Sequence, residues 1–515
     1  MCLVSFFFKK HLPLRFRILC ILYFETTLAS DTCYSYTFSS IFIPFLCTVP
    51  GFVTDHVQSL SDAIGFDMET LSYTLGMFLC YPLGIIMAML PFGKIRHFFS
   101  FLLGAFLLQF TIGKQWIHHA IAVILSYVMF LILPRSLSKS VVPFFIMTYV
   151  TLGHLHRQFV NYLGWDLDFT GSHMVLSMKL YSFAYNLYDG ERLKKGTEDR
   201  AAKKCADVAI EEMPGLIEFL GYTFNFSTIL AGPAFEYKIY ANACDGSLLY
   251  DKDGKPKGKI PSQILPSLKP FFASLICLGA FVVGNGAFPL LDPTDPQNFL
   301  PVVITPEFLK KPWINRYAYS WFALFCIRMK YYFAWKNAEG ASNIWYAGFE
   351  GFEKDGKAKG WENSNNVDIL DFETAPNIKT LSAAWNKKTA NWLGRYVYMR
   401  TNGSLLATYG MSAFWHGFYP GYYMFFLTVP FLTVCERIGR KKISPRFSEK
   451  KWSLYGIATM MATSFTVQYS ILAFQLLAFD WALTCWKSHY FCGHLVAFVF
   501  YMVVSNIPTP KKKGD

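Results

Sequence analysis

Apolar residues in this chain come in long blocks that are separated by shorter polar segments. Crossing a bilayer takes roughly 20 apolar residues, and about eleven blocks are long enough to span or to lie buried in a bundle. They run at 69–91, 98–113, 116–134, 141–153, 173–188, 216–232, 267–291, 313–335, 404–435, 452–478 and 488–505. Backbone in lipid must satisfy its own hydrogen bonds, which favours helices throughout. The pattern therefore predicts an all-α, polytopic transmembrane helical bundle of about 11 helices, some broken or re-entrant.

Composition supports the membrane interpretation. The 515 residues are 53% hydrophobic and only 16% charged, whereas a soluble protein carries about 25% charged residues. The twelve cysteines include no CxxC pair. We expect them to be reduced, small apolar residues, because no metal-ligand spacing is present. We therefore expect no metal and no cofactor.

The net charge of +13 is unevenly distributed. Lysine and arginine concentrate at 191–204, at 436–451 and in the tail at 511–513. Basic short loops favour the cytosolic side of a membrane. Two apolar blocks separate the 436–451 loop from the tail, so both should face the cytosol. No aromatic stripe interleaves these basic residues, so we expect no nucleic-acid partner.

The domain organisation predicted from these patterns has three parts. Residues 1–56 form an N-terminal extension in which a basic stretch precedes the apolar segment 18–24. This segment resembles a short signal peptide, but an extra anchor helix or an unused upstream translation start fits equally well. Residues 57–505 form one membrane-embedded catalytic domain, and residues 506–515 form a cytosolic basic tail.

His416 is the most informative polar residue, because it lies in SAFWHGFYPGYYMFF near the middle of an apolar block. An ionisable group at membrane depth is a functional candidate by default. Glycine and proline nearby (Gly417, Pro420, Gly421) should break the helix. A neutral imidazole is a suitable general base for an alcohol. The alternative is a histidine that is simply hydrogen-bonded inside the bundle.

Asn386 is a second polar anomaly, in LSAAWNKKTANWLGRYVYMR. Apolar and basic positions alternate there with a period near 3.6, which predicts an amphipathic helix over 381–400. Such a helix could lie at the interface or line a cavity. An asparagine amide can donate to a developing oxyanion, although a capping or structural role is the alternative. No nucleophile elbow is present, so direct transfer is favoured over a covalent acyl-enzyme.

WNKKTANWL together with SAFWHGFYPGY resembles the paired signature of the membrane-bound O-acyltransferases, in particular the lysophospholipid acyltransferase branch. Three further segments are similar to that branch, at 170–190, 224–237 and 328–349. The resemblance covers roughly residues 57–505. It implies a helical bundle that encloses an intramembrane reaction chamber, with acyl-CoA entering from the cytosol and the lysolipid entering laterally.

The resemblance also implies roles for individual residues. His416 would be the catalytic base, and Asn386 would complete the site. Weaker candidates for substrate binding are Trp385, Thr389, Trp392, Trp415, Lys330, Tyr331, Tyr332 and Arg395. The last four could approach the phosphates or pantetheine arm of CoA. Helix-end snorkelling and aromatic-belt anchoring explain them equally well.

These expectations combine into an acyl-CoA-dependent lysophospholipid acyltransferase, with acyl-CoA as a substrate and membrane lipids as neighbours. The tail, ending Lys512-Lys513-Gly514-Asp515, resembles a dilysine retrieval signal. It predicts a multi-pass protein of the endoplasmic-reticulum membrane with a cytosolic C-terminus. The sequence specifies neither headgroup preference nor oligomeric state.

Three alternatives stay open at this point. The acceptor could be a sterol, a diacylglycerol or a protein. The chain could be a transporter in which His416 relays protons, although its polar residues do not repeat in two halves as in an inverted-repeat transporter. It could also be a non-catalytic lipid-binding scaffold.

Overall fold

The computed structural model describes Val49 and residues 51–64, 67–164, 166–197, 199–291, 300–447 and 451–510. These residues form helices and loops without β-strands, apart from isolated bridges. The all-α prediction is therefore confirmed. The chain from Pro50 to Asp515 forms one compact unit by its contacts. The predicted signal-like segment and the dilysine tail lie outside the described residues, and the predicted domain boundaries stay predictions.

The helices follow one another along the described chain and are joined by loops of unequal length. They are α4 (Gly51–Ile64), α5 (Met68–Met89), α6 (Lys94–Ile112), α7 (Ile117–Ile132), α8 (Arg135–Val160), α9 (Phe169–Lys194), α10 (Arg200–Lys204), α11 (Leu216–Thr223), α12 (Tyr237–Cys244), α13 (Ile264–Ala287), α14 (Pro306–Leu309), α15 (Trp313–Ile344), α16 (Ile369–Glu373), α17 (Ile378–Ala384), α18 (Lys387–Leu393), α19 (Leu405–His416), α20 (Pro420–Lys442), α21 (Leu454–Leu476), α22 (Phe479–Ser488) and α23 (Cys492–Ser505).

Four helical stretches among the described residues are long and apolar enough to cross a membrane. They are Met68–Met89, Lys94–Ile132, Ile264–Ala287 and Leu454–Leu476. The pair α22 and α23, bent by 66°, makes a fifth if it counts as one broken span. The prediction of a polytopic helical membrane protein is therefore confirmed, whereas the count of about 11 helices stays a prediction.

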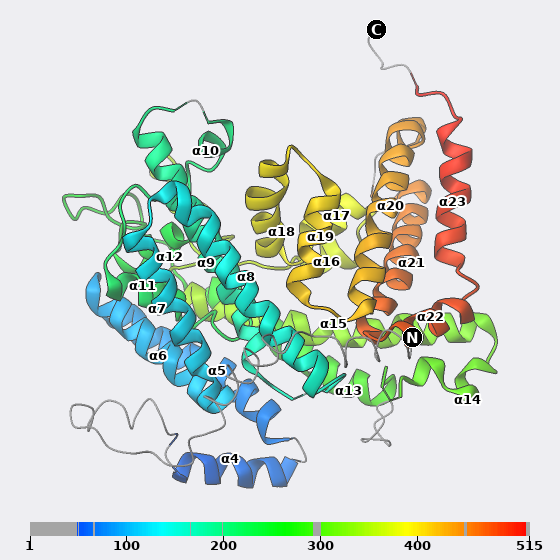
Figure 1. The fold of residues 1–515 in the computed structure, drawn as a ribbon, viewed down its shortest axis with the longest axis horizontal. Helices are drawn as coiled ribbons and strands as arrows, with labels where there is room; N and C mark the ends of the chain where they lie inside the picture. The colour runs from blue at the N-terminus through cyan, green and yellow to red at the C-terminus, as the bar shows by residue number, and fades with distance from the viewer. Residues whose placement is uncertain are drawn as a thin grey trace, which may run out of the picture. The chain divides into compact units, whose positions relative to one another are not determined.

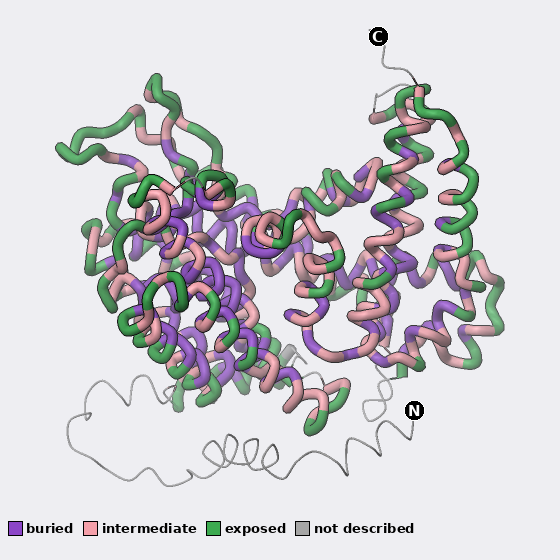
Figure 2. The backbone as a smooth tube through the Cα atoms, turned by 45° about the horizontal axis from the view of Figure 1, so that its top comes forward, coloured by how far each residue is buried: buried purple, intermediate pink, exposed green. Residues whose placement is uncertain are grey.

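Large apolar side chains remain exposed along the outer helices. On α13, Ile276 is 72% exposed and Val283 is 74% exposed, and on α23 Val496 is 59% exposed. Figure 2 shows α23 with mostly exposed and intermediate residues, whereas buried residues gather inside the bundle. Contiguous apolar surface of this kind is unusual on a soluble monomer. These exposed apolar faces are therefore suited to contact with the hydrocarbon chains of a bilayer.

The helices that carry the two candidate motifs lie between two groups of longer helices (Figure 1). On one side α8 packs along α9, and on the other α20 packs along α21. Beneath them α13 and α15 lie side by side along most of their lengths. Between the two groups, α18 contacts both α9 and α19, and α19 contacts α8 and α20. This arrangement places the motifs at the centre of the bundle.

Two predicted apolar blocks and one predicted amphipathic helix are broken rather than continuous. The block at 404–435 breaks where expected, because α19 ends at His416 and α20 begins at Pro420. The block at 216–232 is helical only to Thr223 and then continues as buried turns. The continuous helix predicted over 381–400 is wrong. Asn386 has φ 46° and ψ 51°, and a left-handed residue cannot continue a right-handed helix.

Two exposed hairpins share one ten-residue pattern, YDKDGKPKGK at 250–259 and FEKDGKAKGW at 352–361. Each turns at a glycine with positive φ, Gly254 at 76° and Gly356 at 81°. Equivalent backbone bonds close both turns, with N–O distances of 2.9 and 2.8 Å. The pattern occurs only as this one pair, so it is not a repeat of fixed period. The second hairpin leads directly into 362–368, the segment that contacts the candidate site.

Candidate active site

His416 is the last residue of α19, and its ring lies among aromatic side chains. Its Nδ1 atom is 2.7 Å from the carbonyl oxygen of Ser412. A carbonyl can only accept, so Nδ1 carries the hydrogen and Nε2 keeps a lone pair. The surrounding rings have centroids 4.7 to 5.7 Å from that of His416 and belong to Trp415, Tyr422, Phe426 and Phe474. The imidazole is half-buried and is set up to accept a proton at Nε2.

The turn after His416 rests on a second histidine, which the sequence analysis missed. His154 of α8 is buried, and its Nε2 donates to the carbonyl oxygen of Trp415 at 3.1 Å. Gly417 has φ +115°, and a Cβ there would lie 3.2 Å from the His154 ring. Its place in HLH, at the end of an apolar block, was the available signal. His154 therefore supports the backbone on which His416 is carried.

Asn386 is held by another asparagine, Asn366, also missed in the sequence. The Asn366 Nδ2 atom donates to the Asn386 Oδ1 atom at 3.2 Å. Asn366 also accepts two backbone N–H bonds at 2.9 Å, from Lys387 to its carbonyl oxygen and from Lys388 to its Oδ1. Within the described residues, the Nδ2 atom of Asn386 makes no hydrogen bond. Asn386 therefore presents free amide hydrogens.

Trp385, one of the predicted site residues, is packed into an aromatic cluster. Its ring centroid lies 4.8 to 5.8 Å from the rings of Tyr331, Tyr332, Trp335 and Phe372. Stacked and edge-on aromatic pairs contribute about 0.5–1.5 kcal/mol each beyond simple burial. The cluster anchors the break between α17 and α18 against α15. It fixes the backbone immediately before Asn386.

Helix α9 brings the two motifs together. The Trp415 Nε1 atom donates to the carbonyl oxygen of Met174 and to Ser177 Oγ, both at 3.1 Å. Thr389 Oγ1 lies 3.4 Å from the sulfur of Met178. Residues 174 and 178 are one helical turn apart, about 6 Å along the axis. The residue before His416 and the third residue after Asn386 therefore bind adjacent turns of one helix.

Trp392 contacts both the His416 motif and helix α9. Its buried ring lies 6.0 Å from that of Trp415 and 5.4 Å from that of Tyr181 on α9. The three predicted residues Thr389, Trp392 and Trp415 thus form one contact region around α9. His416 and Asn386 make no hydrogen bond to each other among the described contacts.

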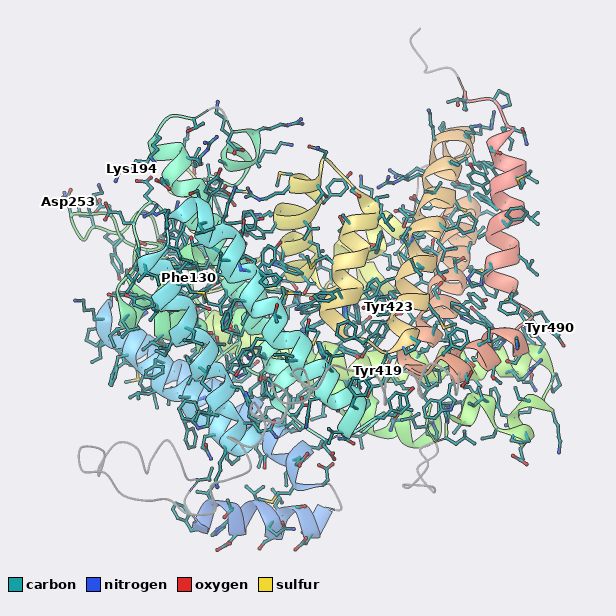
Figure 3. The ribbon with its side chains drawn as sticks, viewed as in Figure 1. Phe130, Lys194, Asp253, Tyr419, Tyr423 and Tyr490 are labelled. Carbon is teal, nitrogen blue, oxygen red and sulfur yellow. The ribbon has the colours of Figure 1, made fainter. Side chains whose placement is uncertain are left out.

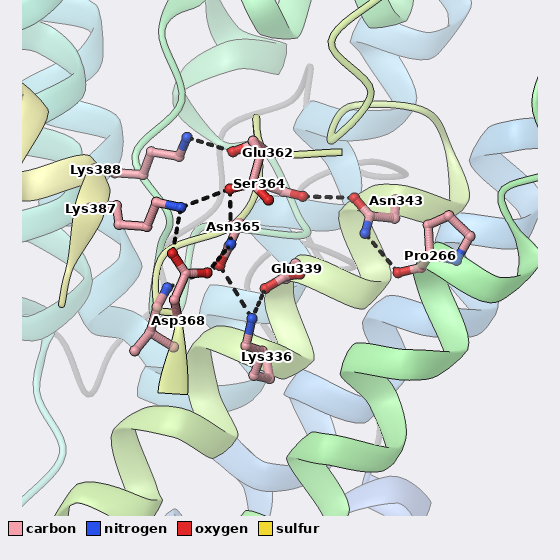
Figure 4. Close-up of polar contacts among 11 residues, drawn as sticks. Pro266, Lys336, Glu339, Asn343, Glu362, Ser364, Asn365, Asp368, Lys387 and Lys388 are labelled. Carbon is pink, nitrogen blue, oxygen red and sulfur yellow. Dashed lines mark hydrogen bonds and ion pairs between the residues drawn. The ribbon is translucent and has the colours of Figure 1, made fainter. Parts of the chain in front are cut away.

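A polar network holds the segment 362–368 against the start of α18 (Figure 4). The Lys387 Nζ atom pairs with Glu362 at 2.7 Å and with Asp368 at 2.9 Å. Burial alone would raise the pKa values of both carboxyls, but hydrogen bonds from Lys387 and Asn365 outweigh it, so both pKa values are lowered. Burial lowers the pKa of Lys388 to about 8. The network fixes α18 and so fixes the turn that Asn386 occupies.

The residues predicted to approach CoA have separate surroundings. Lys330 Nζ lies 5.3 Å over the ring of Tyr331. The Tyr332 hydroxyl is buried and donates to Glu373 at 2.7 Å. Arg395 pairs with Asp207 at 2.7 Å. Tyr331 and Tyr332 share the cluster around Trp385, whereas Arg395 lies at the other end of α18. Their contact with CoA stays a prediction.

Two buried polar networks near the site were not predicted. Arg328 makes a two-pronged ion pair with Glu373, both N–O distances being 2.9 Å. The Tyr396 hydroxyl lies 2.7 Å from Asn186 Oδ1 and 2.9 Å from Glu236 Oε1, and its single hydrogen is shared between these two acceptors. Charged and amide residues inside apolar blocks were the only signal for them, because the partners are 45 to 210 positions apart.

Within the described ranges, no three histidine, cysteine or acidic side chains lie together as the ligands of one metal ion would. A surface hollow of about 500 Å³ is lined by residues that include Phe130, Arg135, Lys194 and Glu211. Figure 3 places Phe130 and Lys194 away from Tyr419, which follows the His416 turn. None of the predicted site residues lines this hollow, and the chamber expected around His416 stays a prediction.

Comparisons with known proteins point to one family. The family model described as "MBOAT, membrane-bound O-acyltransferase family" matches residues 155–472, which include both motifs. A Schizosaccharomyces pombe protein named lysophospholipid acyltransferase is 31% identical, over 88% of this chain and 90% of its own length. A rat protein named membrane-bound glycerophospholipid O-acyltransferase 2 is 30% identical, over 82% of this chain and 80% of its own.

A plant protein extends the similarity over almost its whole length. Lysophospholipid acyltransferase 1 of Arabidopsis thaliana is 27% identical over 89% of this chain and 99% of its own length. The match of the family model covers more than half of the chain and includes the His416 and Asn386 motifs described above. The chain therefore belongs to the membrane-bound O-acyltransferase family and is an O-acyltransferase.

Proposed function

We propose that this enzyme transfers an acyl group from acyl-CoA to the free hydroxyl of a lysophospholipid. The names of the fission-yeast and plant relatives support the acceptor. The exposed apolar faces support a substrate that diffuses within the bilayer. Acyl-CoA is the proposed donor, because a thioester is activated for direct attack and the sequence offers no nucleophile elbow for an acyl-enzyme.

The first step is deprotonation of the acceptor. His416 Nε2 takes the proton of the glycerol hydroxyl while that oxygen attacks the thioester carbon. The Nδ1–H bond to Ser412 holds the required tautomer and orients the ring. A positioned general base contributes typically 10²–10⁴-fold to the rate.

In the second step, negative charge builds on the thioester oxygen as the new C–O bond forms. Asn386 Nδ2 donates to this oxygen. The C–S bond then breaks, the CoA sulfur leaves as a thiolate, and it receives the proton held by His416. The products are a diacyl phospholipid and free CoA. The aromatic walls around His416 exclude water, which strengthens these polar contacts and limits thioester hydrolysis.

One observation carries the proposal more than any other. The base and the amide each have one polar atom committed to a protein partner and one left for substrate: Nε2 of His416 and Nδ2 of Asn386. Both motifs dock on neighbouring turns of α9. A transporter or scaffold would not require a free base and a free donor held near one helix.

The donor and acceptor are tested together with purified enzyme in lipid nanodiscs. Radiolabelled oleoyl-CoA is mixed with lysophosphatidylcholine, lysophosphatidylethanolamine, lysophosphatidylserine, lysophosphatidic acid, cholesterol or diacylglycerol, and labelled products are separated by chromatography. The proposal predicts labelled diacyl phospholipid from at least one lysolipid. Labelled sterol ester or triacylglycerol alone, or no acyl transfer from CoA, would contradict it.

We also propose that the enzyme resides in the endoplasmic-reticulum membrane with its C-terminus in the cytosol. The basic loop at 436–451 and the terminal lysines support this orientation. An epitope added after Asp515 should be accessible to antibody after selective plasma-membrane permeabilisation. Replacement of Lys512 and Lys513 by serine should shift the protein to later compartments. Staining only after full permeabilisation would show that the C-terminus lies in the lumen, and would contradict the proposed orientation.

A further inference from the structure

Asn366 uses its polar groups to form the turn that carries Asn386. Its carbonyl oxygen and its Oδ1 atom each accept a backbone N–H at 2.9 Å, from Lys387 and Lys388. Its Nδ2 atom donates to Asn386 Oδ1 at 3.2 Å. Asn366 is 2% exposed, so water cannot replace these bonds. Three hydrogen bonds to Asn366 thus hold Asn386 and the two residues after it, and so stabilise the left-handed conformation of Asn386.

These bonds determine which way both amides face. A backbone N–H can only donate, so the Asn366 atom next to Lys388 N must be the oxygen. The other end of the Asn366 amide must then be the NH2 group, which can only donate to Asn386. Asn386 therefore meets it with its oxygen, and its own NH2 group faces away. The assignment follows from one obligate donor, so it needs no choice between equivalent amide rotamers.

The position of Asn366 is itself fixed from outside the turn. Lys387 spans Glu362 and Asp368 on either side of Asn366 in sequence, and Lys388 Nζ donates to the carbonyl oxygen of Glu362 at 3.0 Å. The Asp368 N–H donates to the carbonyl oxygen of Ala384 at 2.9 Å. Figure 4 shows how this segment meets Lys387 and Lys388 of α18. The segment that carries Asn366 is therefore fixed by contacts of its own, independently of the bond to Asn386.

We propose that Asn366 is a positioning residue that makes Asn386 a hydrogen-bond donor toward the substrate. The inference rests on the proposed function, in which Asn386 stabilises the oxyanion. With the amide reversed, the Asn386 oxygen would face the developing negative charge and repel it. Asn366 thereby sets the sign of the interaction without touching the substrate.

Asn366→Asp isolates this role. Aspartate keeps an oxygen for the Lys388 N–H but replaces the donor facing Asn386 with a second acceptor. The Asn386 amide then rotates so that its NH2 group bonds the carboxylate, which leaves its oxygen toward the substrate. Protonation of the introduced carboxylate at lower pH restores an O–H donor and the original orientation. Recovery of activity by acid at an unchanged melting temperature distinguishes this role from a merely structural one, in which activity and melting temperature would recover together.

The experiment measures single-turnover acyl transfer in nanodiscs between pH 5 and 8, expressed as the ratio of variant to wild type at each pH. N366D should fall about 10²–10³-fold at pH 8, the effect of losing one oxyanion donor, with KM for acyl-CoA unchanged. The ratio should rise at least tenfold by pH 5. The matched control is N391D, which makes the same change at an exposed position on α18 and should stay at the wild-type rate.

Two further variants separate the possible failures. N386A at the wild-type rate would overturn the proposed role of Asn386 itself. If N386A is inactive and N366D keeps the wild-type rate, only the positioning role of Asn366 is overturned. If N366D does not fold, N366S replaces it, because a serine hydroxyl is too short to reach both partners and adds no charge. N366S should lose at least tenfold in rate without recovery in acid, and a wild-type rate would overturn the inference.

Discussion

His154 donates a hydrogen bond from Nε2 to the carbonyl oxygen of Trp415, 3.1 Å away, directly beneath the turn that follows His416. The two residues are 261 positions apart in the chain. This bond joins α8 to the end of α19 and satisfies a carbonyl that the helix end leaves without an intrahelical donor. Placement of the base therefore depends on a helix that carries neither motif.

Replacing His154 with alanine should lower kcat about tenfold or more while leaving KM for acyl-CoA unchanged. The Trp415 carbonyl would lose its donor, and a buried unsatisfied group costs about 1–3 kcal/mol. His154→Gln retains an N–H at a similar distance and should recover part of the rate. Steady-state kinetics of the two variants checks this. Equal kcat values for H154A and wild type would show that the bond is dispensable.

Gly417→Ala should reduce both activity and thermal stability. A non-glycine residue at φ +115° is strained by about 1–3 kcal/mol, and the new methyl group would press on the His154 ring. Gly410→Ala is the matched control on α19, because nothing lies within 4 Å of its Cβ position. It should be neutral or raise stability by about 0.5–1 kcal/mol. Equal melting temperatures for G417A and G410A would count against the strained turn.

The ion pair between Arg328 and Glu373 should be important for stability. Arg328 has a side chain only 4% exposed and is bonded at three nitrogen atoms, to Glu373 and Gln468. Removing one partner of a buried ion pair leaves an uncompensated charge, which destabilises the fold by about 3 kcal/mol. Arg328→Met should thus lower the melting temperature more than Arg328→Met combined with Glu373→Met. A double variant less stable than the single one would contradict this explanation.

The network at Lys387 should depend on pH in a defined direction. The pKa values of Glu362 and Asp368 are lowered, so their contribution is present above 4.5 and 3.8 and is lost as pH falls further. Burial would lower the pKa of Lys387, but both carboxylates outweigh it and raise its pKa, so its contribution is present below 10.5 and lost above. The stabilising window is therefore about pH 5–10.

Lys387→Met should reduce stability inside this window by up to about 1 kcal/mol, because the carboxylates are partly exposed. The difference from wild type should shrink progressively as pH falls below 3.8, because both carboxyls then become protonated. Thermal melting in detergent across the pH range measures both effects. The control is Lys354→Met, at an exposed lysine of the second hairpin. A constant difference between K387M and wild type from acid to neutral pH would exclude the ionic contribution.

The sequence was sufficient to single out two candidate site residues, and their catalytic roles stay predictions. His416 and Asn386 are conspicuous because a polar residue within an apolar or aromatic segment is expensive to bury. The all-helical fold followed from block length alone. Breaks at Gly417 and Pro420 were also predictable, because those residues interrupt helices for local reasons.

The supporting residues were not predictable in the same way. Asn366 and His154 act on residues 20 and 261 positions away, so their roles exist only in the folded chain. The break at Asn386 was missed for the same reason. The period near 3.6 over 381–400 is real, but tertiary bonds from Asn366 stabilise a left-handed residue that local propensity disfavours.

The central claim is that His416 accepts the proton of the acceptor hydroxyl. The most direct test is the single-turnover rate of acyl transfer from acyl-CoA to the preferred lysophospholipid in nanodiscs, for wild type and His416→Ala. His56→Ala, at an exposed histidine of α4, serves as the control. H416A should lose about 10²–10⁴-fold in rate at an unchanged melting temperature, and H56A should keep the wild-type rate. A folded H416A protein with an undiminished rate would contradict the account.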